Sequence, residues 1–426
     1  MKHLQLFGFI VLWGIYSPFI QAELNIDITK AFETKVPIAV SPFGSRTTLP
    51  ENIAAIINDD LNRSGYFKTL AEQDMLTQPT SASQVLMRNW QILGQEYLLV
   101  GHIQPINKSY KILFQLLDVS KNEQIMDYKI IAKRKGLRRA AHQISDLVYE
   151  KLTGNKGVFG TKIAFVSSDN NLNKRSYRLH IADVDGYNTQ TIVSSTEPIM
   201  SPAWSPDGNK IAYVSFENHR AAIFVQILTT GERIKVTSFP GINGAPAWSP
   251  DGNQLALTLS KAGSPNIYIL NLASKQLTQL THNTGINTEP TWSPDGRTLV
   301  FTSNQAGGKP QLYKIGYQGG KSTRLTFKGS YNASASFSPD GRSIAMVHAN
   351  GENYKIAVMN LRTGSVKTLT SGSLDESPSF SSNGAMVLYA TRQGGRGVLS
   401  AVSIDGRINQ TLAFKNPEVR EPAWDP

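Results

Sequence analysis

One short motif recurs six times in the second half of the chain, at an almost constant interval. Its clearest copies read Pro-x-Trp-Ser-Pro-Asp-Gly and begin at Pro202, Pro246 and Pro290. Weaker or truncated copies follow, and the aromatic position of the motif falls at residues 204, 248, 292, 337, 380 and 424. The steps between these positions are therefore 44, 44, 45, 43 and 44 residues. Such a period indicates one supersecondary unit that is repeated along the chain.

Each repeat has the sequence pattern of four short strands. Ser-Pro-Asp-Gly is typical of a turn, because proline fixes φ, aspartate bonds its own backbone and glycine accepts the left-handed conformation. A strand with one large aromatic residue precedes the turn, and an apolar strand such as Leu255 to Leu259 follows it. Two further strands complete the unit, as at Asn266 to Leu270 and Leu277 to Thr281. Four antiparallel strands in about 40–45 residues predict the blade of a β-propeller.

The number of blades follows from a strand that lacks its partner. Thr161 to Ser167 matches the second strand of a blade, and Tyr177 to Asp183 and Thr189 to Val193 match the third and fourth. No turn motif precedes this set, and its missing first strand is Pro422-Ala423-Trp424 at the other end of the chain. We therefore predict a ring of six blades that is closed by the C-terminal strand. Burial of Trp424 would stabilise the closure by up to roughly 4–6 kcal/mol.

Residues 1–22 have the pattern of a secretory signal peptide. Lys2 and His3 precede an apolar run from Leu6 to Tyr16, and Ala22 offers a small residue for cleavage. An uncleaved anchor is the alternative. No later stretch has the ~18 consecutive apolar residues of a membrane span, so we expect no integral membrane segment after cleavage. The chain has no cysteine, which excludes disulfides, thiolate metal sites and cysteine nucleophiles.

The charge of the chain is strongly basic. Lys and Arg number 43 against 32 Asp and Glu, which gives a net charge of +11. The densest cluster is Lys133-Arg134-Lys135 with Arg138 and Arg139, where we expect a strand to pass into a helix. In an exported chain we interpret this cluster as a solvated face that attracts acidic partners or anionic lipid heads rather than nucleic acid.

Residues 23–155 lack the repeat and are expected to form an N-terminal α/β domain, packed on one face of the propeller of residues 156–426. Glu23 to Ile28 alternates polar and apolar residues, so it can lie as an edge strand or hang free. Thr48 to Glu51 has the spacing of a capping box and predicts the start of a helix that Gly65 ends. Further strand patterns lie at residues 38–42, 97–103 and 110–119, a helical pattern at 137–152, and a linker at 154–157.

Signals of catalysis or of metal and cofactor binding are weak. No Gly-x-Ser-x-Gly elbow occurs, and Gly320-Lys321-Ser322 has Ile315 where a phosphate-binding loop needs glycine. The seven histidines show no metal-ligand pairing in sequence. Asp183 to Gly186 lacks the other ligands of a calcium loop, and its composition favours a hairpin turn. We therefore expect no catalytic residue, no metal and no cofactor; carboxylates that meet across the ring stay an open alternative.

The loops that lead into the first strand of each blade should gather at one mouth of the central channel. They combine apolar and hydrogen-bonding residues, which is typical of a protein-docking rim. The plainer interpretation is that Glu or Asn before Pro only shapes the start of each strand. The six segments are residues 197–201, 242–245, 286–289, 331–333, 374–376 and 419–421.

These features together resemble those of a known family. A signal peptide, an N-terminal α/β domain, the junction from Ala141 to Gly154 running into Phe159 to Val166, and six blades together are similar to the TolB family of the bacterial Tol-Pal system. The stretch from Asn243 to Trp292 adds to the resemblance, which spans essentially all of the chain after the signal. Phe337 and Phe380 replace the motif's tryptophan, and Ser382-Asn383 replaces Pro-Asp, which should loosen those turns without breaking the ring.

The resemblance implies a periplasmic scaffold that is a monomer and not an enzyme. Family members bind the lipoprotein Pal at the propeller mouth and TolA through their N-terminal segment, and so support outer-membrane integrity and constriction at division; other outer-membrane proteins are further candidate partners. The TolA-binding segment would comprise Glu23, Leu24, Asn25, Ile26, Asp27 and Ile28. The Pal-binding rim would comprise Ile242, Asn243, Ala245, Thr288 and Glu289, with Met200, Asn332, Glu376 and Arg420 as neighbours. A histidine is common in the family where Ile242 stands.

The competing interpretation is an enzyme, either a propeller-based periplasmic hydrolase or the substrate-gating domain of a peptidase. It would need carboxylates or a triad directed into the channel, and a nucleophile in the N-terminal domain. The sequence of the N-terminal domain indicates neither.

Overall fold

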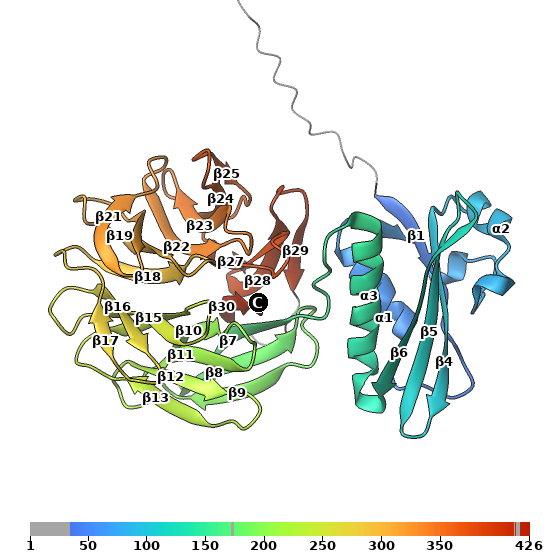
Figure 1. The fold of residues 1–426 in the computed structure, drawn as a ribbon, viewed down its shortest axis with the longest axis horizontal. Helices are drawn as coiled ribbons and strands as arrows, with labels where there is room; N and C mark the ends of the chain where they lie inside the picture. The colour runs from blue at the N-terminus through green and yellow to red at the C-terminus, as the bar shows by residue number, and fades with distance from the viewer. Residues whose placement is uncertain (1–34, 172–173, 413, 415–417) are drawn as a thin grey trace, which may run out of the picture.

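The computed structural model describes residues 35–171, 174–412, 414 and 418–426, and Figure 1 shows their arrangement. The expected signal peptide and the segment from Glu23 to Ile28 lie outside the described residues. A sheet with helices comes first, followed by a ring of sheets. Within the described ranges, no helix has the length and apolar character to cross a membrane.

The N-terminal region is built on a twisted sheet of order β3-β1-β4-β5-β6, with β2 beside β4. β1 is parallel to both β3 and β4, and β4, β5 and β6 form an antiparallel meander. The strands are β1 (Val36–Val40), β2 (Gly44–Ser45), β3 (Phe67–Thr69), β4 (Tyr97–Ile106), β5 (Ser109–Asp118) and β6 (Glu123–Lys133). The helices are α1 (Ile53–Arg63), α2 (Met87–Ile92) and α3 (Leu137–Thr153), with 3₁₀ turns at Glu72–Asp74, Ala82–Gln84 and Arg134–Gly136.

Two apolar layers hold this sheet, one on each face. α1 and α3 lie together on one face, where Ile57, Leu61 and Ile144 are buried against Ile112 and Phe114 of β5. The chain around α2 covers part of the opposite face through a second cluster that contains the fully buried Trp90. The helical pattern expected at 137–152 is confirmed as α3, and Gly154 ends it in the left-handed conformation, with φ of 75°.

The expected capping box at Thr48 to Glu51 is wrong. α1 begins at Ile53, and the cap is Asn52, whose Oδ1 accepts a hydrogen bond from the Ala55 amide at 3.1 Å. Asn52 can cap the helix directly before the buried isoleucine face begins, so the helix starts later than the Ser/Thr-x-x-Glu spacing suggests. Glu51 instead lies 4.0 Å from Arg138 of α3.

The second region is the predicted propeller, with six four-stranded antiparallel sheets in the described ranges. The sheets are, from the inner strand outward, β10 (Ile199–Trp204), β11 (Lys210–Ser215), β12 (Ala222–Ile227), β13 (Arg233–Thr237); β14 (Asn243–Trp248), β15 (Gln254–Leu259), β16 (Asn266–Asn271), β17 (Leu277–Gln279); β18 (Asn287–Trp292), β19 (Thr298–Ser303), β20 (Gln311–Gly316), β21 (Gly319–Arg324); β22 (Tyr331–Phe337), β23 (Ser343–Ala349), β24 (Lys355–Asn360), β25 (Val366–Thr368); β26 (Glu376–Phe380), β27 (Met386–Gln393), β28 (Arg396–Ser403), β29 (Asn409–Leu412); and β30 (Val419–Trp424), β7 (Lys162–Asn171), β8 (Lys174–Asp183), β9 (Gln190–Ser195).

The last of these sheets joins the two ends of the propeller. β30 pairs antiparallel with β7, and Trp424 lies opposite Ile163 in this register. The predicted closure by the C-terminal strand is therefore confirmed.

Three of the four motif tryptophans tie one blade to its neighbour through the indole N–H. The indole N–H of Trp248 donates to the Ala203 carbonyl at 3.0 Å, and that of Trp292 donates to the Ala247 carbonyl at 3.2 Å. The same bond joins the blade of the C-terminal strand to the next one, because the indole N–H of Trp204 on β10 donates to the Ala423 carbonyl on β30 at 3.0 Å; we call this junction the seam. The side chain of phenylalanine has no N–H, so the blades of Phe337 and Phe380 lack this bond.

The turns in those two blades nevertheless keep the hydrogen bonds of the motif. Ser338 Oγ donates to Asp340 at 2.6 Å, and Ser381 Oγ donates to Asn383 at 2.8 Å. Because asparagine replaces aspartate as the acceptor, the expected loosening of these turns is absent from their hydrogen bonding.

The N-terminal region contacts the end of the ring where the Ser-Pro-Asp-Gly turns lie. Asn383, in the turn of the fifth motif copy, donates to the Lys156 carbonyl at 2.7 Å, and Gln410 of β29 donates to the Arg63 carbonyl. Asp146 of α3 accepts bonds from the Phe159 and Gly160 amides at 2.8 and 3.2 Å. The inner strands run toward this end of the ring, because each of them ends at its Ser-Pro-Asp-Gly turn, so they begin at the opposite mouth of the channel.

Candidate functional site

The inner strand of every blade carries the same bulge near the free mouth of the channel. In each blade the register shifts between this strand and its neighbour, and the residue at the bulge has positive φ although it is not glycine. These residues are Ser201, Ala245, Glu289, Ser334, Ser377 and Glu421, with φ between 47° and 54°. The residue after each is proline in five blades and Ala335 in the sixth.

These bulges line a cavity of about 200 Å³ in the central channel. Its walls are the six residues with positive φ and the six that follow them. A bulge re-aims the side chain at the inserted position, and here the repeat directs six of them to one space. Two of the six are carboxylates, Glu289 and Glu421, so two acidic residues line the same cavity.

Both carboxylates are engaged in bonds to the following blade. Ser334 donates to Glu289 through its amide at 3.0 Å and through its hydroxyl at 2.8 Å, and Thr302 donates to Glu289 at 2.8 Å. The Ser201 amide donates to Glu421 across the seam. These two side chains therefore link neighbouring blades by hydrogen bonds at the channel.

Glu421 is held in an environment that favours its neutral form. Burial raises the pKa of its carboxyl to about 7, and the charges of Glu376 and Glu289 act in the same direction. The Ser201 N–H and Arg420 oppose the shift without cancelling it. Near neutral pH, folding therefore keeps a proton on Glu421 that the unfolded chain would lose.

The substitution Glu421→Gln is expected to stabilise the protein at pH 8 but not at pH 4. A folded pKa above the unfolded one gives stability that is complete below about pH 4.5 and is lost as pH rises through about 7. Glutamine cannot ionise and still accepts the Ser201 N–H, so the gain at pH 8 should reach at most about 3 kcal/mol. Urea unfolding at both pH values measures it, with the exposed Glu232→Gln as control. An equal effect of Glu421→Gln at both pH values would contradict the assignment.

The loops around this mouth are held by buried polar side chains at one position of the repeat. Asn243 accepts from the Phe239 amide at 2.9 Å and donates to the Phe239 carbonyl at 2.6 Å. Asn332 donates to Gln311 at 2.9 Å. The equivalent residues Asn243, Asn287, Asn332 and Asp375 are all at most 1% exposed. Asn243 and Asn332, which we expected at the rim, therefore shape the rim loops and do not present side chains on the surface.

The residue immediately before each of these four buried polar residues is aliphatic or aromatic. Ile242 is 47% exposed and Ile286 is 52% exposed; Leu374 is also exposed, and Tyr331 is partly buried. The backbone of the two isoleucines is fixed, because the Ile242 amide donates to Ser260 at 2.7 Å and the Ile286 amide donates to Asn304 at 2.8 Å. Loops with a fixed backbone thus carry apolar side chains that are exposed among the described residues.

The structure places the other expected rim residues at different depths. Ala245 and Glu289 line the channel, and Thr288 lies beside them on β18, where it accepts a bond from Thr258 at 3.3 Å. Met200, Glu376 and Arg420 are partly buried on the inner strands β10, β26 and β30. Ile286 and Leu374 lie in the predicted rim segments but were not among the individual residues expected to bind, and the 75% exposed Phe327 lies outside those segments. The pairing of an apolar residue with Asn or Asp at a fixed place in the repeat could have identified the first two.

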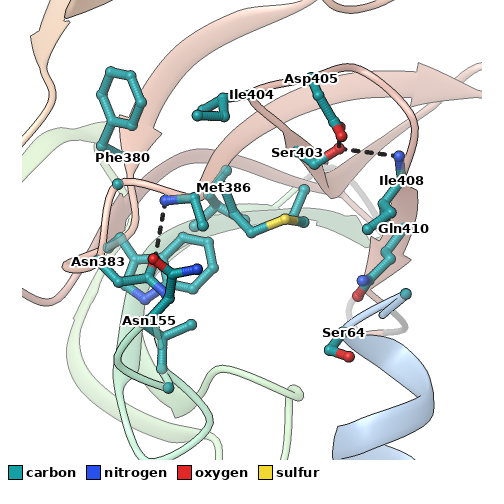
Figure 2. A pocket seen from close by; sticks show the side chains of 18 of the residues that line it. Ser64, Asn155, Phe380, Asn383, Met386, Ser403, Ile404, Asp405, Ile408 and Gln410 are labelled. Carbon is teal, nitrogen blue, oxygen red and sulfur yellow. Dashed lines mark hydrogen bonds between the residues drawn. The ribbon is translucent and has the colours of Figure 1, made fainter. Parts of the chain in front are cut away.

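A larger cleft lies between the N-terminal region and the propeller. It has a volume of about 750 Å³, and Figure 2 shows part of its wall. Ser64 and Asn155 come from one side, and Asn383, Met386 and Gln410 come from the propeller. Lys35, the first described residue, also lines this cleft.

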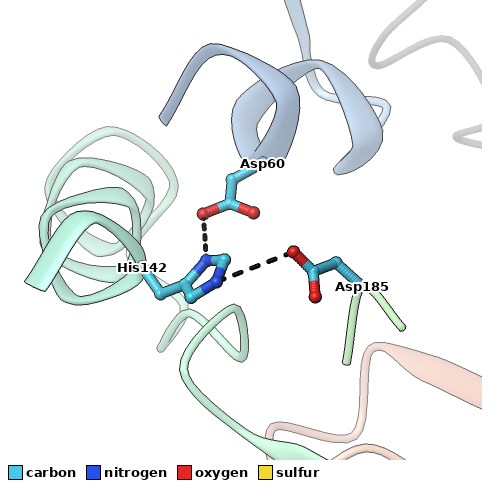
Figure 3. A group of neighbouring side chains, drawn as sticks. All are labelled: Asp60, His142 and Asp185. Atoms are coloured by element: carbon cyan, nitrogen blue, oxygen red, sulfur yellow. Dashed lines mark hydrogen bonds and ion pairs between the residues drawn. The ribbon is translucent and has the colours of Figure 1, made fainter. Parts of the chain in front are cut away.

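A buried charge cluster bridges the same two regions. His142 of α3 lies between two carboxylates, as Figure 3 shows: its Nδ1 is 2.7 Å from Asp60 of α1, and its Nε2 is 3.7 Å from Asp185. Arg138 makes an ion pair with Asp185 and packs over the Tyr187 ring at 3.8 Å. Asp185 sits in the turn between β8 and β9, which confirms the hairpin that we expected from Asp183 to Gly186.

This cluster has metal-ligating residue types, and one ligand atom of each residue lies within 4.8 Å of the others. The two carboxylates face different nitrogens of the imidazole, and both already have cationic partners. The guanidinium of Arg138 is already bound to the Asp185 oxygen that faces His142. Arg63 likewise pairs with Asp60 at 2.6 Å. The arrangement is an ion-pair network that joins the propeller to α1 and α3.

Comparisons with known proteins agree on one family for both regions. Residues 149–426 match a family model described as the TolB beta propeller domain, and residues 24–125 match one described as the TolB amino-terminal domain. The Tol-Pal system protein TolB of Methylococcus capsulatus is 57% identical over 405 residues, which cover 95% of each chain. The protein of the same name from Nitrosococcus oceani is 56% identical over 420 residues, which cover 98% of this chain and 96% of that one.

A solved structure shows the same architecture. The crystal structure of TolB from Acinetobacter baumannii superimposes with a TM-score of 0.86 at 43% sequence identity. The match covers 93% of this chain and 98% of that chain, so it includes both regions and not the propeller alone.

Proposed function

The chain belongs to the TolB family of Tol-Pal system proteins, and from that premise we propose that it is a non-catalytic periplasmic scaffold. In this proposal the channel mouth binds the lipoprotein Pal, and the segment from Glu23 to Ile28 binds TolA. By holding both partners, the protein would maintain outer-membrane integrity and support constriction at division. Residues 1–22 would be the signal peptide, residues 23–155 the N-terminal domain and residues 156–426 the propeller.

The observation that carries the Pal site is the ring of exposed apolar side chains at the mouth. Ile242, Ile286 and Leu374 occupy the same position in three of four consecutive repeats, and Tyr331 occupies it in the fourth. An apolar centre with polar residues around it is the composition of a protein interface. The described part of the N-terminal region contacts the other end of the ring, at Asn383 and Gln410, and not this mouth.

The state of the channel carboxylates favours a scaffold over a hydrolase. A glycosidase needs one carboxyl to act as an acid and a second that is free to act as base or nucleophile. Glu289 accepts three hydrogen bonds and Glu421 accepts the Ser201 N–H, so both serve the contacts between blades. Hydrolysis of a sugar or peptide panel by the purified chain would favour the competing enzyme.

Deletion of Glu23 to Lys30 is expected to abolish TolA binding and to leave Pal binding intact. An alternating segment of this kind can add as a strand to the edge of a partner's sheet, whereas the mouth residues belong to the propeller and are not part of the deleted segment. Calorimetric titration with the globular domains of TolA and Pal measures both affinities. We expect TolA affinity to fall at least 100-fold, and equal TolA affinity in the truncated chain would remove this part of the proposal.

A matched variant separates the role of the segment's apolar face from its length. Replacing Leu24, Ile26 and Ile28 by serine keeps the number of residues but removes the alternation that a strand would present to a partner. If the alternation matters, this variant should lose TolA binding as the deletion does; a wild-type affinity would assign the effect to length alone.

A further inference from the structure

Among the residues that the structure describes, nothing covers one half of the sheet face that lies opposite α1 and α3. On the end near α2, Leu98 and Val100 of β4 and Leu117 of β5 are buried against Trp90 and its neighbours. Along β4 the residues on this face continue as His102, Gln104 and Ile106, because side chains of a strand alternate between faces. None of these three is buried. The covering segment therefore ends halfway along the strands.

The strand register extends this open half across three strands. Gln104 pairs with Lys111 and Lys111 pairs with Ile131, and the rows on either side are set by the same register. Directly paired residues point to the same face. We call the resulting group the basic sheet face; its members are His102, Gln104, Ile106, Ser109, Lys111, Leu113, Lys129, Ile131 and Lys133.

The basic sheet face combines positive charge with exposed apolar side chains. None of its nine members is acidic, and three are lysines. Ile131 is 67% exposed and Ile106 is 39% exposed. Further exposed cations border it, at Lys108 in the β4–β5 turn and at Arg134 and Lys135 directly after β6.

The nearest acid on this face is already engaged. Asp127 lies one pleat beyond Lys129 on β6, and its carboxylate accepts a bond from Gln115 at 3.2 Å. The cations of the basic sheet face therefore have no acidic neighbour within the nine positions, and their field extends into solvent.

Neither protection of a sheet edge nor a protein interface explains the composition of the basic sheet face. Lysines on an edge strand prevent pairing with other chains, and β6 is the edge of its sheet. That role does not explain why Ile131 and Ile106 are exposed among them. A protein partner is disfavoured as well, because the centres of protein interfaces are depleted in lysine.

We propose that the basic sheet face docks on an anionic phospholipid bilayer. Lysines interspersed with single apolar side chains suit the boundary between lipid headgroups and acyl chains. Each cation near such a surface strengthens binding roughly fivefold, and the two isoleucines can enter the boundary. This docking does not involve the channel mouth, so it concerns association with a membrane surface rather than the binding of a protein partner.

The test uses the chain from Glu23 onward, which keeps every described residue but lacks the apolar run from Leu6 to Tyr16. Co-sedimentation is measured with phosphatidylcholine vesicles that contain about one third phosphatidylglycerol, and with pure phosphatidylcholine vesicles, at low and high salt. We expect binding only to the anionic vesicles, weakened by salt. The double variant Lys129→Glu/Lys133→Glu should bind at least tenfold more weakly.

The matched control reverses two exposed lysines on the propeller, Lys314→Glu/Lys321→Glu, and so changes the net charge equally. This control should bind as the unmodified chain does. If both double variants lose binding equally, the overall charge is responsible and the proposal fails. It also fails if the unmodified chain binds both kinds of vesicle equally or neither.

A second measurement tests contact by the apolar side chains. Because the chain has no cysteine, Ile131→Cys can be labelled with a polarity-sensitive dye at a single site, and Ile234→Cys on β13, where isoleucine is 40% exposed, serves as the reference. Anionic vesicles should shift the emission to the blue at 131 only. An unchanged emission at 131 would overturn the proposed docking face, even if the charge variants behave as expected.

Discussion

Removal of the last five residues, from Pro422 to Pro426, is expected to lower the melting temperature by about 10 °C or more. Trp424 is buried among apolar residues of the first and last blades, and its indole N–H donates to Thr161 at 2.8 Å. Loss of its burial costs up to roughly 4–6 kcal/mol, and each kcal/mol corresponds to about 2–4 °C in a domain of this size. The truncation also removes the Ala423 carbonyl that accepts from Trp204. Thermal unfolding followed by circular dichroism measures the change.

The substitution Trp424→Phe separates the apolar contribution from the hydrogen bond. Phenylalanine occupies the equivalent place at Phe337 and Phe380 within the same ring, so it should be tolerated sterically. It keeps most of the burial and loses only the bond to Thr161, which should cost about 1 kcal/mol. We expect a small decrease in melting temperature for this variant and a large decrease for the truncation. A truncated protein that melts as the full chain does would show that the seam contributes nothing to stability.

The double substitution Ile242→Asp/Ile286→Asp is expected to weaken Pal binding at least 100-fold without destabilising the propeller. Both side chains are about half exposed, so the folded chain loses little when they are replaced. In a complex, each would lose its apolar contact and would bring a carboxylate that must be desolvated. Two such penalties of about 2 kcal/mol each correspond to roughly a thousandfold in affinity. Isothermal titration with the globular domain of Pal measures the effect.

The control for this experiment is Ile234→Asp. Ile234 is 40% exposed, on the outer strand β13 rather than at the mouth, so the same chemical change is made away from the proposed interface. Pal affinity should be unchanged in this control. If the mouth variant bound Pal as tightly as the control, the ring of apolar side chains would not be the binding surface.

The fold could be predicted from the sequence because the propeller is a repeat. A fixed period places each strand, and the unpaired strand pattern at Thr161 to Ser167 predicts where the ring closes. Trp424 and Ile163 indeed meet in one sheet. The N-terminal region offers no such redundancy, so the start of α1 was misplaced: the capping-box spacing at Thr48 competed with Asn52, and local propensity alone does not decide between two caps.

The candidate site was predictable as a location but not as a set of contacts. The sequence places Asn243 and Asn332 at the mouth, yet it does not reveal that both side chains turn inward. Asn243 bonds to the loop at Phe239, and Asn332 bonds to Gln311 at the start of β20. The bridge through His142 was missed for a related reason. Its partners Asp60 and Asp185 lie on separate elements far along the chain, and no local spacing reports that they meet.

The most direct test of the proposed function is hydrogen exchange of the chain with and without the globular domain of Pal. The account predicts that binding slows exchange of the backbone amides at the starts of the inner strands, around residues 242–245, 286–289 and 331–334. Amides of the Ser-Pro-Asp-Gly turns at the opposite end should not be shielded directly. Protection confined to those turns, or to the outer strands, would contradict the assignment of the channel mouth as the surface that holds the partner.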